Sequence, residues 1–461
     1  MQQNIFTIVQ RPFLRLKDLL WNITARDFIC IIILFTVSLL LRIPNIDFPR
    51  VTIFDEVIYA NYAIHMIEHI PFMDIHPPLA RMLFVEAAKM EPFTSHGIQM
   101  GINEPFDDFP FIDVRFFVSL FGILFPLIIY AIGRALDYTP RVALLLGLFI
   151  ATDNAFIIYS RAILPDMFLV VFNFLAVLFA FLAVRSKGLQ SHLYVWCSGI
   201  FVGLAISTKW TALALFPILA LLYLLYRKLG AIIVFSAIAC ILYVLIFATY
   251  LMAYFPNGGP SDNFHAAAGE YWVAKVEFPK IDSMKSALFF LPSLHRSILD
   301  ANSSPYVTAQ ALSADGAVSW PVARTQMIFW LKNLPSRQVT LSGNNMLWVT
   351  AFFVFLFDLV WIAVRLRSTK TLMVKKDELI LLAGYAANYL PFLLIHRPMY
   401  LYHYFTALIF LILLLPKVTP RIADCLAKVT NDMLFAKVFI VFAAFLIFIN
   451  FILILPSTYG F

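Results

Sequence analysis

The adjacent acids Asp55 and Glu56 are the first residues of this sequence whose types could do chemistry. They begin a polar stretch that also contains Asp74 and His76, although the surrounding chain is strongly apolar. A carboxylate can accept a proton from a nucleophile such as a hydroxyl group. Ionisable side chains beside hydrocarbon are costly, so they indicate function by default. We therefore expect Asp55 and Glu56 to be catalytic.

Basic and hydrogen-bonding residues recur near the ends of later apolar segments, and they complement the two acids. Arginine and lysine can bind a phosphate and stabilise it as a leaving group. Acids and bases together beside lipid suit a sugar carried on a lipid phosphate, and no nucleotide-binding G-x-G-x-x-G stretch is present. The candidate residues are Arg42, Arg115, Arg161, Lys209, Arg397, His403 and Tyr404.

The composition predicts the elements that must position these residues. The chain has 461 residues, of which 62% are hydrophobic and 13% charged, whereas soluble domains have roughly 25% charged residues. Apolar runs of roughly 17–25 residues predict an all-α polytopic membrane protein. Eleven spans are expected, over residues 28–44, 114–133, 142–158, 163–184, 193–208, 211–226, 230–254, 343–364, 378–395, 400–416 and 434–456.

The loop charges predict the orientation of these spans. Lys and Arg are concentrated in alternate loops, for example at Arg134 and Arg141, and such loops are typically cytoplasmic. The N-terminus is then cytoplasmic, and the candidate residues all fall on the opposite side. The net charge of +7 therefore reflects topology and does not indicate nucleic-acid binding. The four cysteines are too dispersed for a disulfide framework or a metal site.

The expected organisation is a single transmembrane domain over residues 28–456, preceded by a cytoplasmic or interfacial segment, 1–27. Its outer loop 45–113 is predicted to contain amphipathic helices at about 55–69 and 77–90 that lie on the membrane surface. A second outer loop, 255–342, precedes a four-span C-terminal part, 343–456.

The residues alone leave alternatives open. Asp55 and Glu56 could be solvated loop acids, and Arg42 and Arg115 could be snorkelling residues at span ends. His76, which precedes two prolines, suits a turn better than a metal site. No ligand set demands a metal, although a divalent cation, Mg or Mn, near Asp55 or Asp74 is left open.

The stretch "FDEVIYANYAIHMIEHIPFMDIHPPLARML", residues 54–83, resembles the first outer loop of the protein O-mannosyltransferases, glycosyltransferases of the GT-C class. An Asp-Glu pair is followed there by a helix and then by Phe-x-Asp-x-His-Pro-Pro-Leu. Further segments resemble the family in the same order: "LRIPNIDFP" with Arg42, "DVRFFVSLFG" with Arg115, "SRAILPD" with Arg161, "STKW" with Lys209, and "HRPMYLYHYF" with Arg397, His403 and Tyr404.

This resemblance implies a role for each residue. Asp55 would be the general base for a Ser or Thr hydroxyl, and Glu56 would organise the site. Arg42, Asp74, His76 and Arg115 would set loop architecture and charge balance. The donor phosphate would be contacted by Arg161, Lys209, Arg397, His403 and Tyr404.

The resemblance also implies a reaction: inverting transfer of mannose from polyprenyl or dolichyl phosphate mannose to exported polypeptides. Eukaryotic members carry a large MIR domain in the outer loop before the eighth span, which is too short here to hold one. The bacterial form in the cell membrane is therefore favoured, with its site extracytoplasmic, over an endoplasmic reticulum enzyme. Association with the Sec translocon or a dimer is left open.

Two rival functions remain. Another GT-C lipid-phosphate-sugar transferase, similar to the aminoarabinose transferases, would move a different sugar or modify a glycolipid. A transporter or flippase would place charges near span centres and often shows repeated halves, whereas the charges here gather towards one side.

Overall fold

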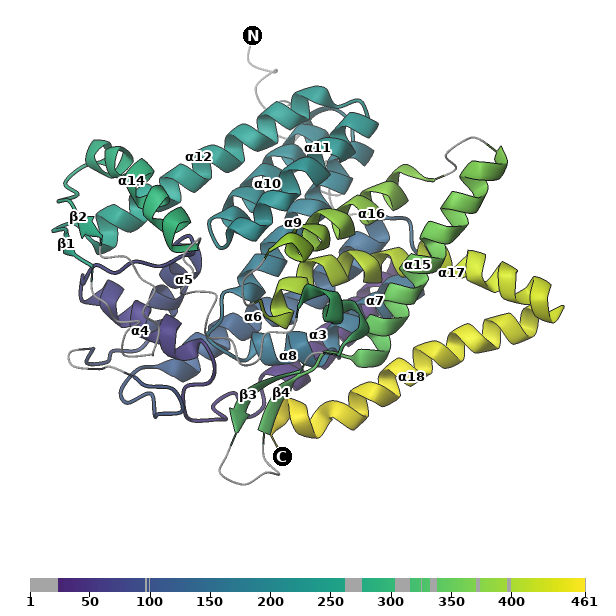
Figure 1. The fold of residues 1–461 in the computed structure, drawn as a ribbon, viewed down its shortest axis with the longest axis horizontal. Coiled ribbons are helices and arrows are strands. Elements are labelled where there is room, and N and C mark those ends of the chain that lie inside the picture. Colours follow the sequence, from purple (N-terminus) through teal and green to yellow (C-terminus); the bar gives the residue numbers. More distant parts are fainter. Residues whose placement is uncertain are drawn as a thin grey trace, which may run out of the picture.

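The computed structural model describes residues 24–95, 98, 100–261, 276–302, 316–324, 326–331, 338–369, 374–395 and 399–460. The described chain is mostly helical (Figure 1). Local signals begin several helices: Thr24 and Asp27 form a capping box at the first of them, and Thr139 caps another before Pro140. Residues 1–23 of the N-terminal segment, which was predicted to be cytoplasmic or interfacial, lie outside the described residues.

The helices of the first half form the body of the molecule. They are α3 (Ala25–Arg42), α4 (Glu56–Ile67), α5 (Leu79–Ala88), α6 (Phe111–Ala135), α7 (Pro140–Ala151), α8 (Asn154–Ser160), α9 (Asp166–Arg185), α10 (Gly188–Ile206), η1 (Trp210–Ala214), α11 (Leu215–Leu225) and α12 (Leu229–Tyr254).

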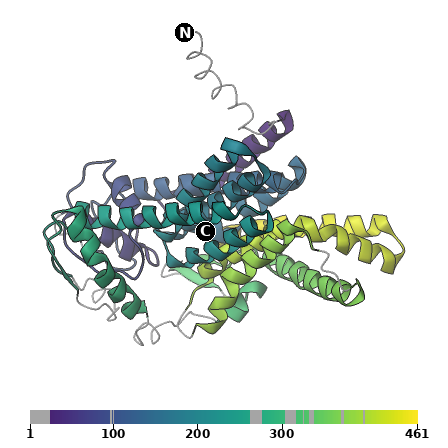
Figure 2. The ribbon, with the colours of Figure 1, turned by 90° about the horizontal axis from the view of Figure 1, so that it is seen from above.

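The second half adds short hairpins and the C-terminal helices. They are β1 (Gly259–Pro260), β2 (Glu277–Phe278), α14 (Met284–Asn302), η3 (Ala317–Val322), β3 (Met327–Leu331), β4 (Gln338–Leu341), α15 (Asn345–Thr369), α16 (Lys376–Tyr389), η4 (Leu390–Leu394), η5 (Leu401–Tyr404), α17 (Phe405–Thr430) and α18 (Met433–Tyr459). Both views show α15, α17 and α18 extending away from the body (Figures 1 and 2).

Each of the eleven predicted spans corresponds to a helix or a short run of helices. In the described part, seven helices are long and apolar enough to cross a membrane, or eight if the bent pair α7–α8 is one span. The protein is therefore a multi-pass membrane protein. The count of eleven and the orientation stay predictions.

The predicted span 142–158 is not one straight helix, because α7 and α8 meet at 62°. Asp153 causes the break: its Oδ1 accepts a hydrogen bond from the Ala155 amide and so begins a new helix. Its Oδ2 accepts from the Asn344 amide (3.0 Å) and Trp348 Nε1 (2.7 Å). A fully buried acid thus joins the break to the start of α15.

The two helices predicted in the first outer loop exist as α4 and α5, and α4 is largely covered by protein. Nine of its residues, from Glu56 to Met66, are buried in protein. Helix α4 packs on α5, which in turn contacts α6 and α12. Loop one is therefore part of the protein core.

The second outer loop contains the strands that an all-α prediction omitted. Strands β3 and β4 pair antiparallel with a bulge between Ile328 and Trp330. Strand β4 lies against the end of α18, beside the C-terminus (Figure 1). This hairpin contacts loop one, because Phe329 of β3 packs on Phe54.

Candidate active site

Asp55 lies at the start of α4 in a strained local backbone. The preceding residue, Phe54, has a φ of +47°, which is unfavourable for a bulky side chain. Its ring packs on Phe329 of β3 (4.7 Å between centroids) and on Tyr400 (5.7 Å). Asp55 is the N-cap residue, yet its side chain makes no capping hydrogen bond. The half-buried carboxylate therefore does not cap α4.

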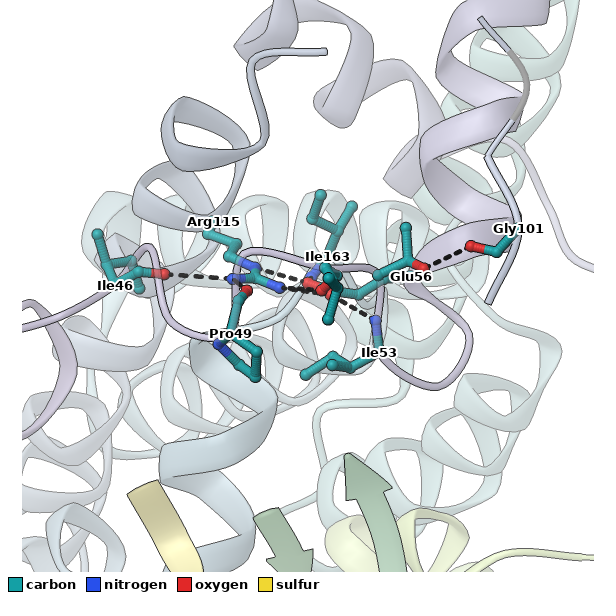
Figure 3. A network of polar contacts seen from close by, with 9 residues as sticks. Ile46, Pro49, Ile53, Glu56, Gly101, Arg115 and Ile163 are labelled. Carbon is teal, nitrogen blue, oxygen red and sulfur yellow. Dashed lines mark hydrogen bonds and ion pairs between the residues drawn. The ribbon is translucent and has the colours of Figure 1, made fainter. Parts of the chain in front are cut away.

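Glu56, the neighbouring acid, is fully buried and its oxygens are well satisfied. Arg115 donates to it from Nε (2.8 Å) and Nη2 (2.6 Å), a bidentate ion pair. The backbone amides of Ile53 (3.1 Å) and Ile163 (2.8 Å) donate to the same carboxylate (Figure 3). These bonds join loop one to α6 and to the connection between α8 and α9, so the Glu56 carboxylate is engaged in holding the fold.

Arg115 is held on its other side by the backbone of loop one. Its Nη1 donates to the carbonyl of Pro49 (2.7 Å), and the carbonyls of Ile46 and Val51 lie at 3.5 and 3.4 Å (Figure 3). The rings of Phe106 and Phe111 stack near its guanidinium, at 5.2 and 5.1 Å. Arg115 is therefore buried in protein and does not snorkel.

Asp74 forms a second buried ion pair, with Arg81 of α5. Asp74 Oδ1 accepts from the amide of His76, and Arg81 Nη2 donates to the His76 carbonyl (3.1 Å). The Arg81 guanidinium also lies over the rings of Tyr62, Phe72 and Tyr250. The His-Pro-Pro turn is thus closed by Asp74 and Arg81, which fits the architectural role expected for Asp74 and His76.

Asp74→Asn should lower the free energy of unfolding by about 3 kcal/mol, because it leaves Arg81 charged and buried without its partner. Asp74→Asn/Arg81→Met should recover much of the loss, since it removes both charges and keeps an apolar side chain. Thermal unfolding in detergent measures both variants. An equally unstable double variant would show that the ion pair is not the cause.

A small pocket with a mixed polar and apolar lining lies between α9, η1, α16 and η5. It is lined by Asp166, Lys209, Asn388, Tyr402, His403 and Thr406, among others. Lys209 Nζ lies 2.8 and 2.9 Å from the two carboxylate oxygens of Asp166, and 4.7 Å from the Tyr402 ring centroid. The ammonium is buried, so its charge is little screened. An anion entering this pocket would compete with Asp166 for Lys209.

Aromatic side chains connect this pocket to Asp55. The Tyr402 ring lies beneath Lys209 and 6.3 Å from the ring of Phe54. Burial raises the pKa of Tyr59 well above its usual range, and the charges of Asp55 and Asp166 raise it further. Phe54, the neighbour of Asp55, and Tyr402, which lines the pocket, therefore connect the two parts of the candidate site.

Other candidates are placed elsewhere. Tyr404 is fully buried between Trp348 and Tyr389 and does not line the pocket. Arg42 is fully buried and donates to the Ala151 carbonyl, so it does not snorkel either. Arg161 lines a different cavity, beside Tyr459. Arg397 lies outside the described residues.

Sequence reasoning assigned no site role to Arg81 or Tyr402. Arg81 belongs to the Pro-Pro-Leu-x-Arg motif. Its position shortly after Asp74, across the Pro-Pro turn, could have indicated that the two residues form an ion pair. Tyr402 gave no signal apart from its neighbour His403. Within the described ranges, no group of three His, Cys, Asp or Glu side chains could hold a metal ion.

Two family models cover most of the chain. "Dolichyl-phosphate-mannose-protein mannosyltransferase" matches residues 32–257, and "C-terminal four TMM region of protein-O-mannosyltransferase" matches residues 292–461. The chain belongs to the protein O-mannosyltransferase family. The first match includes Asp55, Glu56, Arg115 and Lys209, and the second includes His403.

Individual relatives agree with the family models. The chain is 29% identical to dolichyl-phosphate-mannose–protein mannosyltransferase 1 of Saccharomyces cerevisiae over 45% of its own length and 26% of that protein. It is 26% identical to protein O-mannosyl-transferase 1 of Mus musculus over 56% of its length and 37% of that protein. These alignments thus span about a quarter to a third of the curated relatives.

The fold matches a solved member of the same family. A chain of the Saccharomyces cerevisiae protein O-mannosyltransferase Pmt1–Pmt2 complex bound to the sugar donor superposes with a TM-score of 0.78. The match covers 95% of this chain and 91% of that one at 16% sequence identity. The predicted GT-C fold is therefore confirmed.

Proposed function

We propose that this protein O-mannosyltransferase family member transfers mannose from a polyprenyl- or dolichyl-type phosphate mannose to Ser or Thr hydroxyls of exported proteins. The observation that carries the proposal is a short aromatic connection: the ring of Phe54, next to Asp55, lies 6.3 Å from the ring of Tyr402, which lines the Lys209 pocket. The family match supports the choice of sugar and acceptor.

The reaction needs one displacement. The acceptor oxygen forms a bond to the anomeric carbon of mannose while its proton passes to Asp55. The bond from that carbon to the phosphate oxygen breaks, and the lipid phosphate leaves with the electron pair. Asp55 would serve as general base, and Lys209 with His403 would stabilise the leaving phosphate. A β-linked donor would thus give an α-mannosyl product.

Lys209→Gln should raise the KM for the donor lipid and lower kcat/KM by about 10²–10³-fold, because one preorganised cation is lost at the leaving group. A filter-binding assay with polyprenyl phosphate separates this effect from acceptor binding. The double variant Lys209→Met/Asp166→Asn removes both charges and so controls for the effect of an unpaired Asp166 carboxylate. It should bind polyprenyl phosphate as weakly as Lys209→Gln does. Donor binding at the wild-type level in both variants would remove Lys209 from the phosphate site.

We place the enzyme in the cell membrane, with the site facing away from the cytoplasm, as the loop charges favour. Its acceptors would then be exported polypeptides, met near the Sec translocon. A second copy of the chain is a further candidate partner. A requirement for Mg or Mn is tested by assaying transfer after chelation and after adding each metal back.

Deletion of the gene tests the proposal in cells. Glycoproteomics of the deletion strain should show loss of hexose from Ser- and Thr-containing exported proteins. Restoration by the wild-type chain, and not by Asp55→Asn, should follow. If protein hexosylation is unchanged while a glycolipid loses its sugar, the related lipid-phosphate-sugar transferase activity is correct instead.

A further inference from the structure

Arg161, expected at the donor phosphate, makes its contacts with the protein backbone. Its Nη1 donates to the carbonyls of Arg42 and Pro44 (both 2.8 Å), and its Nη2 donates to that of Asn45 (2.6 Å). The side chain begins at the end of α8 and is nearly fully buried. Both terminal nitrogens of the guanidinium are thus engaged with backbone carbonyls, which leaves Arg161 fewer donors for a phosphate.

The ring of Tyr459, at the end of α18, covers the other side of this guanidinium at 5.1 Å. The Tyr459 hydroxyl donates to the carbonyl of Leu41 (2.6 Å). The neighbouring Thr458 accepts from Asn154, whose other contacts hold β4. In α18, Ala436, Ile447 and Thr458 are the buried residues. The end of α18 is thus joined by specific hydrogen bonds to α3 and α8.

Arg161 and Arg115 hold consecutive parts of one segment. The carbonyls of residues 42, 44 and 45 accept from Arg161, and those of residues 46, 49 and 51 lie within reach of Arg115. The same segment leads into Ile53, whose amide donates to Glu56, and then to Asp55. The buried side chains of Arg161 and Arg115 therefore hold the backbone segment that leads to Asp55.

We infer that Arg161, covered by Tyr459, is a positioning residue for Asp55 and does not contact the donor. The inference rests on the proposed function, because it assigns Asp55 to catalysis. It predicts that disturbing the end of α18 changes the rate of the chemical step, although α18 lines no part of the Lys209 pocket. A shift of about 1 Å in a catalytic group can cost roughly 10²-fold in rate.

Steady-state kinetics of three variants test the inference. Arg161→Gln and Tyr459→Ala should each lower kcat by roughly 10–10²-fold and leave the affinity for polyprenyl phosphate within about twofold of wild type. Tyr459→Phe should retain most activity, because the ring that covers Arg161 remains. Arg50→Gln is a matched control in the same segment: its ion pair with Asp47 is exposed, so kcat should not change.

Hydrogen exchange gives a readout that does not need activity. Amides of residues 43–56 should exchange about tenfold faster or more in Arg161→Gln and Tyr459→Ala than in wild type and Arg50→Gln. Unchanged exchange, or a loss of donor affinity with kcat kept, would overturn the positioning role. If the wild-type chain transfers no mannose, the proposed function fails, while the exchange experiment still decides whether Arg161 orders this segment.

Discussion

Asp55→Asn should abolish mannose transfer, with kcat/KM falling by about 10²–10⁴-fold, because the substitution keeps the size of the side chain and removes its capacity to accept a proton. The protein should stay folded. Asp55 makes no capping hydrogen bond to α4, and its neighbour Glu56 carries the buried contacts of the loop. Initial rates with purified protein, mannosyl lipid and an acceptor peptide measure the loss.

Two comparisons decide whether this loss is catalytic. Donor affinity and thermal unfolding of Asp55→Asn should match those of the wild type, since neither the Lys209 pocket nor the Glu56–Arg115 pair is altered. Asp47→Asn, at a partly exposed acid in the same loop, should retain full activity. Wild-type transfer by Asp55→Asn would show that the base lies elsewhere.

Glu56→Gln should have the largest effect on stability, lowering the free energy of unfolding by about 3–5 kcal/mol, since it leaves Arg115 charged and unpaired in the interior. The same carboxylate also accepts from the amides of Ile53 and Ile163, and one of these bonds is lost when an oxygen becomes an NH₂ group. Activity should fall with stability, because Asp55 is the adjacent residue. Chemical unfolding in detergent measures the change.

Glu86 offers the matched control. It pairs with Lys89 at 3.0 Å, but both side chains are about half exposed, and such pairs contribute roughly 0–1 kcal/mol. Glu86→Gln should therefore unfold close to wild type. If Glu56→Gln were as stable as Glu86→Gln, the buried pair would not be what holds loop one to α6.

Hydropathy was enough to predict where the apolar helices lie, because lipid leaves an apolar run of this length few alternatives to helix. The same reasoning missed the bend at Asp153, where a single acid inside an apolar run caps a new helix. It also gave no sign that α4 is largely buried in protein. Nine of its residues are buried because α5 and the surrounding loops cover the faces that the sequence pattern left open.

The residue types of the candidate site stand out in the sequence, but the pairs that these residues form do not. Asp55 and Glu56 are equivalent in the sequence, and what separates them is Arg115, 59 positions after Glu56. Lys209 is likewise joined to Asp166 across 43 positions. Arg161 had the charge that a phosphate needs, yet it donates three hydrogen bonds to the carbonyls of residues 42, 44 and 45. Side-chain type is local information, whereas these partners are brought together by the fold.

The most direct test of the central claim is transfer in a purified system. The wild-type protein is incubated with β-mannosyl phosphoryl polyprenol and a synthetic peptide containing Ser and Thr, and the peptide is analysed by mass spectrometry before and after α-mannosidase treatment. We predict one hexose on a Ser or Thr side chain that α-mannosidase removes, and none with Asp55→Asn. An unmodified peptide, or a hexose resistant to α-mannosidase, would contradict the account.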